Sequence, residues 1–236
     1  MKIGAVVEKN HWTFFQPVYE ELGRHHRTES FAIRQVRWAF VSGRVNRALL
    51  QHDLRSFLRR NDLTFFEWVG ELLVAASRLP KRCAMVARLH SYELYYAAPR
   101  VAWDQVDAVI LVSQAMRRRF LEQQPACRDK AHVVYLGVDL QRFRPAPRTF
   151  QGRLGMLGNL VPIKRIYEVI LALYELHKHG YKATLRIGGT APTLGEPRYP
   201  VRLLELAAQL GLQDYVFLDG YVDAATWLAV SYTHLT

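Results

Sequence analysis

Residues 153–190, RLGMLGNLVPIKRIYEVILALYELHKHGYKATLRIGGT, contain two apolar strands separated by one amphipathic helix. The apolar run Leu154–Leu157 predicts a buried strand. Apolar residues at the 3.6-residue period then predict a helix that opens near Lys164 and ends at Gly180. A second strand is expected at Ala183–Ile187. This order predicts two parallel strands joined by a crossover helix.

The carboxyl edge of this strand pair is the predicted ligand side, because ligands of such units bind beyond the carboxyl ends of the strands. Asn159, Lys164, Gly188 and Gly189 all fall on that edge. The helix N-terminus offers free N–H groups and a partial positive charge, and Lys164 adds a full one. The pattern suits a diphosphate. Spacing alone favours the plainer interpretation, an ordinary crossover with a surface lysine, since short motifs give many false positives.

The composition indicates a globular, basic protein. The chain has 236 residues, half of them hydrophobic, which leaves room for one large or two ordinary domains. Lysine and arginine total 32 against 21 acidic residues, a net charge of +11, which favours anionic partners: phosphates, an anionic membrane face or nucleic acid. The sequence has no zinc-finger, RNA-recognition or basic-zipper signature, so nucleic acid is the least favoured of the three.

The cysteine pattern and the length of the apolar runs indicate the cellular compartment of the protein. Cys83 and Cys127 are isolated and lack metal-type spacing, which predicts no metal site and suits a reducing cytoplasm. The sequence has no apolar run of about 18 residues, which predicts no membrane span. Its first residues enter a strand directly, without the pattern of a signal peptide. We therefore expect a cytoplasmic protein.

Strand and helix patterns alternate along the first 140 residues, which predicts a doubly wound parallel sheet. Strands are expected at 2–8, 30–36, 63–68, 83–90, 106–113 and 132–136. Helices are expected at 14–26, 43–60, 71–78 and 114–123. The 14–26 helix is expected to point Phe15, Val18, Tyr19 and Leu22 inward.

The 43–60 helix is amphipathic and basic. Its apolar side carries Val45, Leu49, Leu50, Leu54, Phe57 and Leu58, and its polar side carries Arg44, Arg47, His52, Arg55, Arg59 and Arg60. Such a helix can lie on an anionic membrane. The pattern favours instead a crossover helix with a solvated basic face, which an α/β domain needs in any case.

The remaining segments give the domain organisation. The first domain is expected at 1–140, a Pro- and Arg-rich linker at 141–151 and a second domain at 152–229. Within the second domain a helix at 200–210 and a strand at 215–218 are expected, with Asp223 as the N-cap of a last helix.

Six segments in the right order resemble the retaining glycosyltransferases of family 4, which have the two-domain GT-B fold. The segments are VARLHSYE (86–93), VDAVILVSQAMRRRF (106–120), VVYLGVDLQRFRP (133–145), LGNLVPIKR (157–165), LRIGGT (185–190) and VFLDGYVD (216–223). The resemblance implies an α/β chain of GT-B type. Its N-terminal Rossmann-like domain would bind the acceptor, and its partial C-terminal Rossmann-like domain would bind the nucleotide-sugar.

The resemblance also implies roles for particular residues. Lys164 matches the lysine that contacts the donor diphosphate, and His90 matches the first-domain histidine that faces the donor sugar, although a structural role for His90 stays open. Gly158, Gly188 and Gly189 would let the backbone approach the nucleotide.

The chain departs from the family pattern at the same edge. Asn159 stands where the family usually has arginine, and Arg165 stands where it usually has glycine and would substitute in part. Leu136 replaces an asparagine, and the loop 8–13 lacks the usual Gly-Gly. These departures place one phosphate contact in doubt and leave acceptor binding at that loop open.

The resemblance implies transfer of a sugar from a UDP- or GDP-sugar to a glycan or lipid-linked acceptor, with retention of configuration, no obligatory metal and no cofactor. The partners would be that donor and acceptor, with an anionic membrane surface at the inner face as a further candidate. The alternative is a non-catalytic nucleotide- or anionic-surface-binding protein with the same fold.

The last residues predict a fragment. The family's acidic motif, two glutamates eight positions apart, is missing from the sequence, and VSYTHLT (230–236) resembles a translated sequencing adapter. We therefore expect a non-native tail and little transferase activity from this chain.

Overall fold

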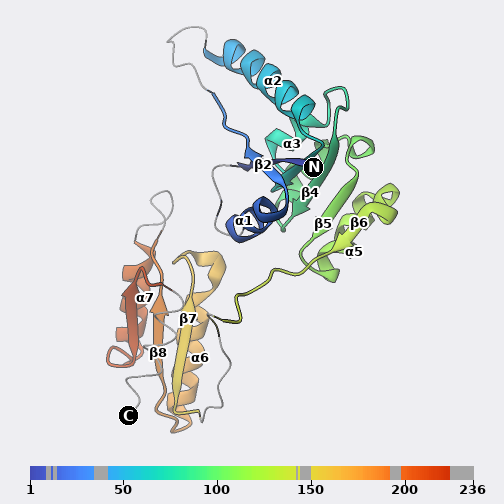
Figure 1. Cartoon of the computed structure of the whole chain (residues 1–236). Coiled ribbons are helices and arrows are strands. Elements are labelled where there is room, and N and C mark those ends of the chain that lie inside the picture. Colours follow the sequence, from blue (N-terminus) through green and yellow to red (C-terminus); the bar gives the residue numbers. More distant parts are fainter. Residues whose placement is uncertain are drawn as a thin grey trace. The chain divides into compact units, whose positions relative to one another are not determined.

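The computed structural model describes residues 1–8, 12, 15–34, 42–141, 143, 150–191 and 198–223, with the backbone alone for 42–44. The chain forms two compact units, Met1–Gly137 and Val138–Thr236 (Figure 1). Most of the predicted linker, the loop 9–11, the helix expected after Asp223 and the tail 230–236 lie outside the described residues.

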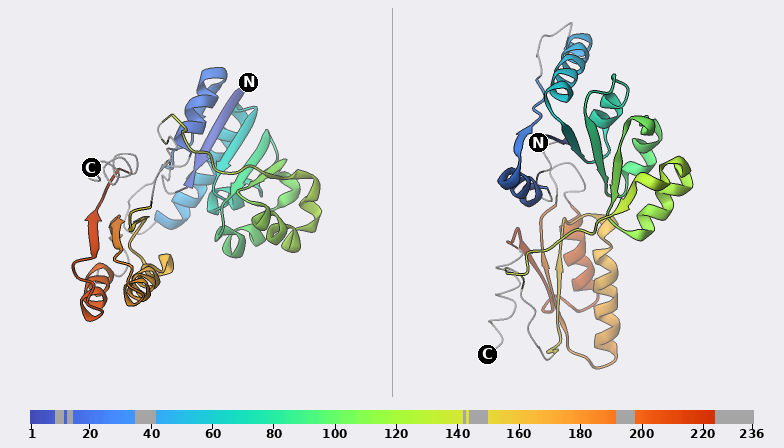
Figure 2. Two further views of the ribbon diagram at one scale, coloured as in Figure 1. Left: turned by 90° about the horizontal axis from the view of Figure 1, so that it is seen from below. Right: turned by 45° about the vertical axis from the view of Figure 1, so that its right-hand side comes forward.

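The first unit is built on a parallel six-stranded sheet with the order β2-β1-β3-β4-β5-β6 (Figure 2). The strands are β1 (Lys2–Val7), β2 (Arg27–Ser30), β3 (Leu63–Glu67), β4 (Ala84–Leu89), β5 (Ala108–Leu111) and β6 (Ala131–Val133). The chain runs outward from β1 to β2 and then returns to β3, so the strand order reverses between β1 and β3. The predicted parallel α/β sheet is confirmed.

Helices separate these strands along the chain. They are α1 (Gln16–His25), α2 (Ser42–Arg60), α3 (Glu71–Ala76), α4 (Glu93–Tyr96) and α5 (Gln114–Gln123), with 3-10 turns at Ala98–Arg100, Trp103–Gln105 and Pro125–Lys130. Both faces of the sheet are covered, because alternate strand residues enter two different apolar clusters: Val6 and Phe66 in one, Ala5 and Phe65 in the other. Among the described residues, no helix has the length and apolarity that a membrane span requires.

The main core also holds the two cysteines. Cys83 and Cys127 are buried, unpaired thiols within the larger apolar cluster, and burial raises the pKa of both. Phe57, Phe66 and Phe120 are among its largest fully buried side chains. Burying each such ring contributes about 1.5–3 kcal/mol.

Strand β2 and helix α1 differ from the predictions. The second strand is Arg27–Ser30 rather than 30–36, because these polar residues pair with β1 as a sheet edge; beyond them Phe31 still donates its N–H to Ala5. Helix α1 buries no residue: Phe15 precedes it and is buried, whereas Val18 is exposed and Tyr19 and Leu22 are half-buried.

Helix α2 buries its apolar side only in its second half. Leu54, Phe57 and Leu58 are buried, whereas Val45 is exposed and Leu49 and Leu50 are half-buried. The predicted apolar side therefore faces the core over its second half only, because the first turns extend past the sheet (Figure 1).

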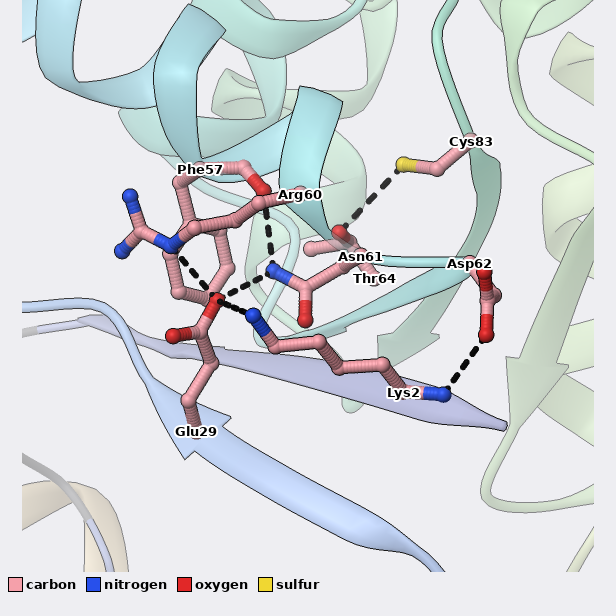
Figure 3. Close-up of polar contacts among 8 residues, drawn as sticks. All are labelled: Lys2, Glu29, Phe57, Arg60, Asn61, Asp62, Thr64 and Cys83. Carbon is pink, nitrogen blue, oxygen red and sulfur yellow. Dashed lines mark hydrogen bonds and ion pairs between the residues drawn. The ribbon is translucent and has the colours of Figure 1, made fainter.

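A polar cluster joins β1, β2 and the end of α2 at the amino edge of the sheet (Figure 3). The Glu29 carboxylate accepts from Arg60 Nε and Asn61 Nδ2, both at 2.7 Å, and lies 3.6 Å from Lys2 Nζ. Asn61 also donates to the carbonyl of Phe57 at 2.8 Å, which ends α2.

The second unit has a parallel three-stranded sheet with the order β7-β8-β9. Its strands are β7 (Arg153–Leu157), β8 (Thr184–Gly188) and β9 (Val216–Gly220), and its helices are α6 (Ile166–Lys178) and α7 (Tyr199–Gln209), with a 3-10 turn at Pro162–Lys164. The predicted strand–helix–strand crossover is thus confirmed.

The predicted burial of the first of these strands is wrong. No residue of β7 is buried, and Leu157 is 39% exposed. The reason is its place at the edge of the sheet, where within the described residues it has a strand neighbour on one side only. The core of this unit lies instead around β8 and the inner faces of α6 and α7, with Ile170, Leu173, Leu185, Ile187 and Leu203.

Candidate functional site

The carboxyl edge of the first sheet carries a buried ion pair between neighbouring strands. Glu67 is the last residue of β3, and Arg88 lies opposite it in register on β4. Arg88 donates through Nε and Nη2 to the two oxygens of Glu67, at 2.8 and 2.7 Å. Glu67 is fully buried, and the bidentate pairing with Arg88 supplies the counter-charge and the two hydrogen bonds that a buried carboxylate needs.

His90 completes this cluster. Its Nε2 atom lies 2.8 Å from Glu67 Oε1. An ionised carboxylate only accepts, so Nε2 must carry the hydrogen, and in neutral His90 the lone pair then belongs to Nδ1. The His90 side chain is 9% exposed. The imidazole is therefore held in one tautomer at the end of β4.

A second buried carboxylate fixes the backbone around His90. Glu93, at the start of α4, is fully buried and accepts from the N–H of His90 at 3.1 Å and of Ser91 at 2.7 Å. These are charge-assisted bonds, which are stronger than neutral ones. The turn from β4 into α4 is rigid as a result.

Trp68 follows Glu67 in an unusual backbone conformation, with φ of 78°. A left-handed conformation costs a residue other than glycine about 1–2 kcal/mol. It places the indole against the His90 imidazole, with ring centroids 4.0 Å apart and planes 24° apart. Next to it, Glu8 accepts from the N–H of Leu72, and any side chain on Gly70 would collide with the Glu8 carboxylate.

The carboxyl edge of the second sheet brings the predicted glycines together. Gly158 donates its N–H to the carbonyl of Gly188 at 3.0 Å, so the segments after β7 and β8 run side by side. Gly189 has φ of 146°, and a Cβ there would overlap the carbonyl of Gly158. Glycine at position 189 therefore allows the backbone after β8 to approach the backbone at Gly158, which is a contact within the chain and not with a ligand. A Cβ added to Gly158 would have none of the surrounding heavy atoms within 4 Å.

Lys164 is exposed and lies at the end of the 3-10 turn Pro162–Lys164. Helix α6 begins at Ile166, so the predicted opening near Lys164 is two residues early, because the 3-10 turn comes first. Arg165, the residue before α6, makes no side-chain cap hydrogen bond to the first turn of the helix, although its carbonyl accepts from the N–H of Glu168 at 3.0 Å.

Arg165 is the residue before α6 and has φ of 55°, in the left-handed region. This geometry gives the physical reason for the glycine usual at that position, because glycine enters this region without strain. The Arg165 guanidinium pairs with Glu168, with Nε 2.7 Å from Oε1. Hydrogen bonds from Arg165 and then Tyr167 lower the pKa of Glu168, so its carboxylate is ionised at neutral pH beside the helix N-terminus.

The structure thus places the predicted residues on two separate sheet edges. Asn159, Lys164 and Arg165 are exposed at the carboxyl edge of the second sheet, together with the glycines described above. His90 lies at the carboxyl edge of the first sheet, where its partners Glu67 and Trp68 were missed. The signal for Glu67 is a charged residue inside the apolar strand 63–68, opposite an arginine inside the next apolar strand.

Two further observations concern ligands. In the part of the chain that the structure describes, no group of three or more His, Cys, Asp or Glu side chains could hold a metal ion. An open hollow of about 530 Å³ lies at the amino edge of the first sheet, at the end of the strands opposite to His90. It is lined by Met1, Lys2, Gly23, Arg24, His25, His26, Arg27 and Asp62.

Known structures share this architecture. The structure of Anabaena HepE in complex with UDP superposes with a TM-score of 0.71 at 20% identity, over 97% of this chain and 72% of that chain. The apo form of WaaB, a lipopolysaccharide outer core galactosyltransferase, gives a TM-score of 0.67 at 15% identity, over 99% and 71% of the two chains. The fold is therefore of the predicted GT-B type, with a partial second domain.

Sequence comparison supplies the family. D-inositol 3-phosphate glycosyltransferase of Nocardia farcinica is 30% identical over 125 residues, which are 48% of this chain and 27% of that protein. The chain thus matches about a quarter of the length of that curated relative. The sequence model of Glycosyltransferase Family 4 matches residues 13–142, more than half of the 236 residues. The chain belongs to glycosyltransferase family 4.

Proposed function

We propose that the protein transfers a sugar from a nucleotide-sugar donor, a UDP- or GDP-sugar, to a glycan or lipid-linked acceptor with retention of configuration. The observation that carries this proposal is the exposed Lys164, two residues before the first residue of α6, at the carboxyl edge of β7. UDP as the donor nucleotide is supported by the HepE structures, which are complexes with UDP and with UDP-glucose.

The chemistry of glycosyl transfer explains why positive charge and N–H donors are needed beside the donor diphosphate. Negative charge grows on the departing diphosphate in the transition state, and groups aimed at that charge lower the barrier. Lys164 supplies a full positive charge, and the first N–H groups of α6 supply donors and a partial one. Gly158 leaves open space in which the phosphates can approach the backbone. This arrangement needs no metal ion to neutralise the leaving group.

Arg165 would add a second cation only after leaving Glu168, because the two side chains pair directly. Asn159, exposed on the same edge, is a neutral hydrogen-bond donor in place of the usual arginine. The diphosphate site of this chain would therefore depend on Lys164 more strongly than a site with two arginines.

His90 would act on the sugar from the first unit. Its tautomer leaves Nδ1 as the acceptor, and its backbone is held by Glu93. In this proposal His90 positions the donor sugar, and Glu67 with Arg88 positions His90.

The test is a transfer assay. Because little transferase activity is expected from residues 1–236, the chain is incubated at high concentration and for many hours with UDP-glucose, UDP-galactose, UDP-N-acetylglucosamine or GDP-mannose and a mixture of glycan acceptors, and transferred sugar is quantified from a radiolabelled donor. Transfer that falls in Lys164→Ala and gives products of retained anomeric configuration by proton NMR supports the proposal. Transfer that is unchanged in Lys164→Ala contradicts the role of this lysine.

A non-catalytic binding protein is the second candidate, and the departures from the family pattern favour it: Asn159 replaces a cation of the diphosphate site, and the guanidinium of Arg165 is paired with Glu168. Binding of UDP or GDP in the absence of transfer to any acceptor, by a chain that is folded as judged by circular dichroism, would decide for this candidate.

Peripheral association with an anionic membrane is also proposed, from the exposed arginines of α2. Arg47, Arg55 and Arg59 are exposed on that helix, and its first turns carry the exposed Val45. Co-sedimentation with vesicles of phosphatidylcholine and phosphatidylglycerol should fall as salt is raised. Binding that persists in phosphatidylcholine alone would contradict an electrostatic attachment.

A further inference from the structure

We propose that a row of aromatic side chains at the carboxyl edge of the first sheet, here called the aromatic ledge, binds a pyranose ring of a glycan acceptor. The ledge consists of Trp68, His90, Tyr92 and Tyr96. This inference rests on the proposed function and deepens it, because it narrows the acceptor to a molecule that is recognised through a sugar ring.

The four rings form a continuous row. Trp68 stacks on His90, with centroids 4.0 Å apart, and Tyr92 follows at 5.9 Å from Trp68. Tyr92 and Tyr96 stack at 5.5 Å with their planes only 14° apart. Rings at these separations attract one another and hold a common orientation.

The outer part of the ledge is open to solvent. Tyr92 is 51% exposed and Tyr96 is 41% exposed, although each is packed against another ring. Two adjacent aromatic rings that stay in contact with water do not contribute the free energy of burial that the rings in the core contribute. An exposed row of this kind is explained by a ligand that covers it.

The supports of the ledge are buried and charged. Glu93 holds the N–H groups of His90 and Ser91, and Glu67 holds the His90 ring. Trp68 retains its left-handed backbone, a strain that persists only where the surroundings enforce it. A surface fixed in this way loses little entropy when it binds a ligand.

The position of the ledge fits a binding site. Trp68 follows β3, which together with β1 flanks the point where the strand order reverses. His90 follows β4, the next strand of the sheet. In open parallel sheets ligands bind outside the carboxyl ends of the strands at this switch point.

The chemistry of the ledge matches a sugar ring better than an apolar chain. The C–H faces of a pyranose are slightly positive and pack on the negative faces of aromatic rings. The hydroxyl groups at its edges need polar partners, and the hydroxyls of Tyr92 and Tyr96, which lie close enough to the Glu8 carboxylate to feel its charge, supply them. Burial first, and then the neighbouring charges, raises the pKa of Tyr96 to about 12, so this hydroxyl keeps its hydrogen at neutral pH.

Saturation-transfer NMR on the 236-residue chain tests the proposal, with maltotriose, lactose, chitotriose and mannotriose as probes and UDP as a separate titrant. We expect at least one of these sugars to bind, and Tyr92→Ala or Tyr96→Ala to weaken that binding about five-fold or more. Tyr92→Phe keeps the ring and loses only the hydroxyl, so it should weaken binding less than Tyr92→Ala does. Tyr95→Ala is the matched control, since Tyr95 is 64% exposed on the same helix and has no ring contact among the described residues.

The outcomes separate this inference from the proposed function. Binding of none of the four sugars, or equal losses in Tyr92→Ala and Tyr95→Ala, would overturn the ledge as a sugar site. A loss of UDP affinity in Tyr92→Ala would also overturn it, by assigning the ledge to the nucleotide base. Sugar binding at the ledge with no UDP binding would uphold the ledge and contradict the proposed function.

Discussion

The Nε2 atom of His90 lies 2.8 Å from Glu67 Oε1, and the same carboxylate accepts two hydrogen bonds from Arg88. All three side chains are buried. One carboxylate therefore compensates a buried guanidinium and orients an imidazole at the end of two neighbouring strands.

Removing the charge of Glu67 should destabilise the first unit strongly. In Glu67→Gln the guanidinium of Arg88 stays buried without its counter-charge, and we expect a loss of about 3–5 kcal/mol in the free energy of unfolding. Urea unfolding followed by circular dichroism measures it. Glu175→Gln, in an exposed pair with Lys178, should cost less than about 1 kcal/mol. Similar losses in the two variants would contradict the assigned role of Glu67.

Gly189 should tolerate no side chain. In Gly189→Ala the new Cβ overlaps the carbonyl of Gly158, and separating the two segments should cost roughly 4 kcal/mol or more, through backbone strain and lost pairing. Gly180 is the matched control, because its φ of 84° is also left-handed but a Cβ there meets open space. Gly180→Ala should cost about 1–2 kcal/mol. Equal costs in urea unfolding would show that the close approach to Gly158 is absent.

Arg165→Gly should stabilise the second unit slightly and change its electrostatics. Glycine adopts φ of 55° without strain, which gains about 1 kcal/mol, partly offset by the greater freedom of glycine in the unfolded chain. The same change frees Glu168 from its cationic partner, so the pKa of Glu168 should rise toward its ordinary value. Thermal unfolding and an NMR titration of the Glu168 carboxyl carbon measure the two effects. A lower melting temperature would contradict the strain argument.

The amino-edge cluster should make stability depend on pH. Burial opposes ionisation of Glu29, but hydrogen bonds from Arg60 and Asn61 outweigh it and lower the pKa of Glu29. A carboxyl whose pKa is lower in the folded state stabilises above its unfolded pKa, and this contribution is lost as the pH falls through the folded pKa. Glu29→Gln should therefore destabilise the protein at about pH 7, and the difference from the parent should shrink at about pH 3. A difference that is constant between these pH values would contradict the lowered pKa.

The sequence correctly predicted the ends of those helices that begin or end at a recognisable capping residue. Helix α5 begins at Gln114 as predicted because the Ser113 hydroxyl accepts from the N–H of Met116, a cap that is visible in the sequence. Helix α6 ends where predicted because Gly180 adopts a left-handed conformation after it.

The failures have physical reasons in long-range pairing. The burial of β7 was mispredicted because its position at a sheet edge depends on strand order, which the run Leu154–Leu157 does not encode. The cluster around His90 was missed because Glu67 lies 21 positions from Arg88 and 23 from His90, and meets them only through the register of β3 with β4. Lys164 was predicted as a diphosphate contact from a local motif, and that role stays a prediction, whereas the pairing of Arg165 with Glu168 required coordinates.

Isothermal titration of the 236-residue chain with UDP tests the central claim, that Lys164 and the N-terminus of α6 bind the donor diphosphate. The variants are Lys164→Ala and, as a control of equal charge change at the other end of the same helix, Lys178→Ala. We predict that Lys164→Ala weakens UDP binding about five-fold or more, that Lys178→Ala changes it less than about two-fold, and that Glu168→Gln strengthens it. Equal effects of the two lysine variants, or no binding of UDP by the parent chain, would contradict the claim.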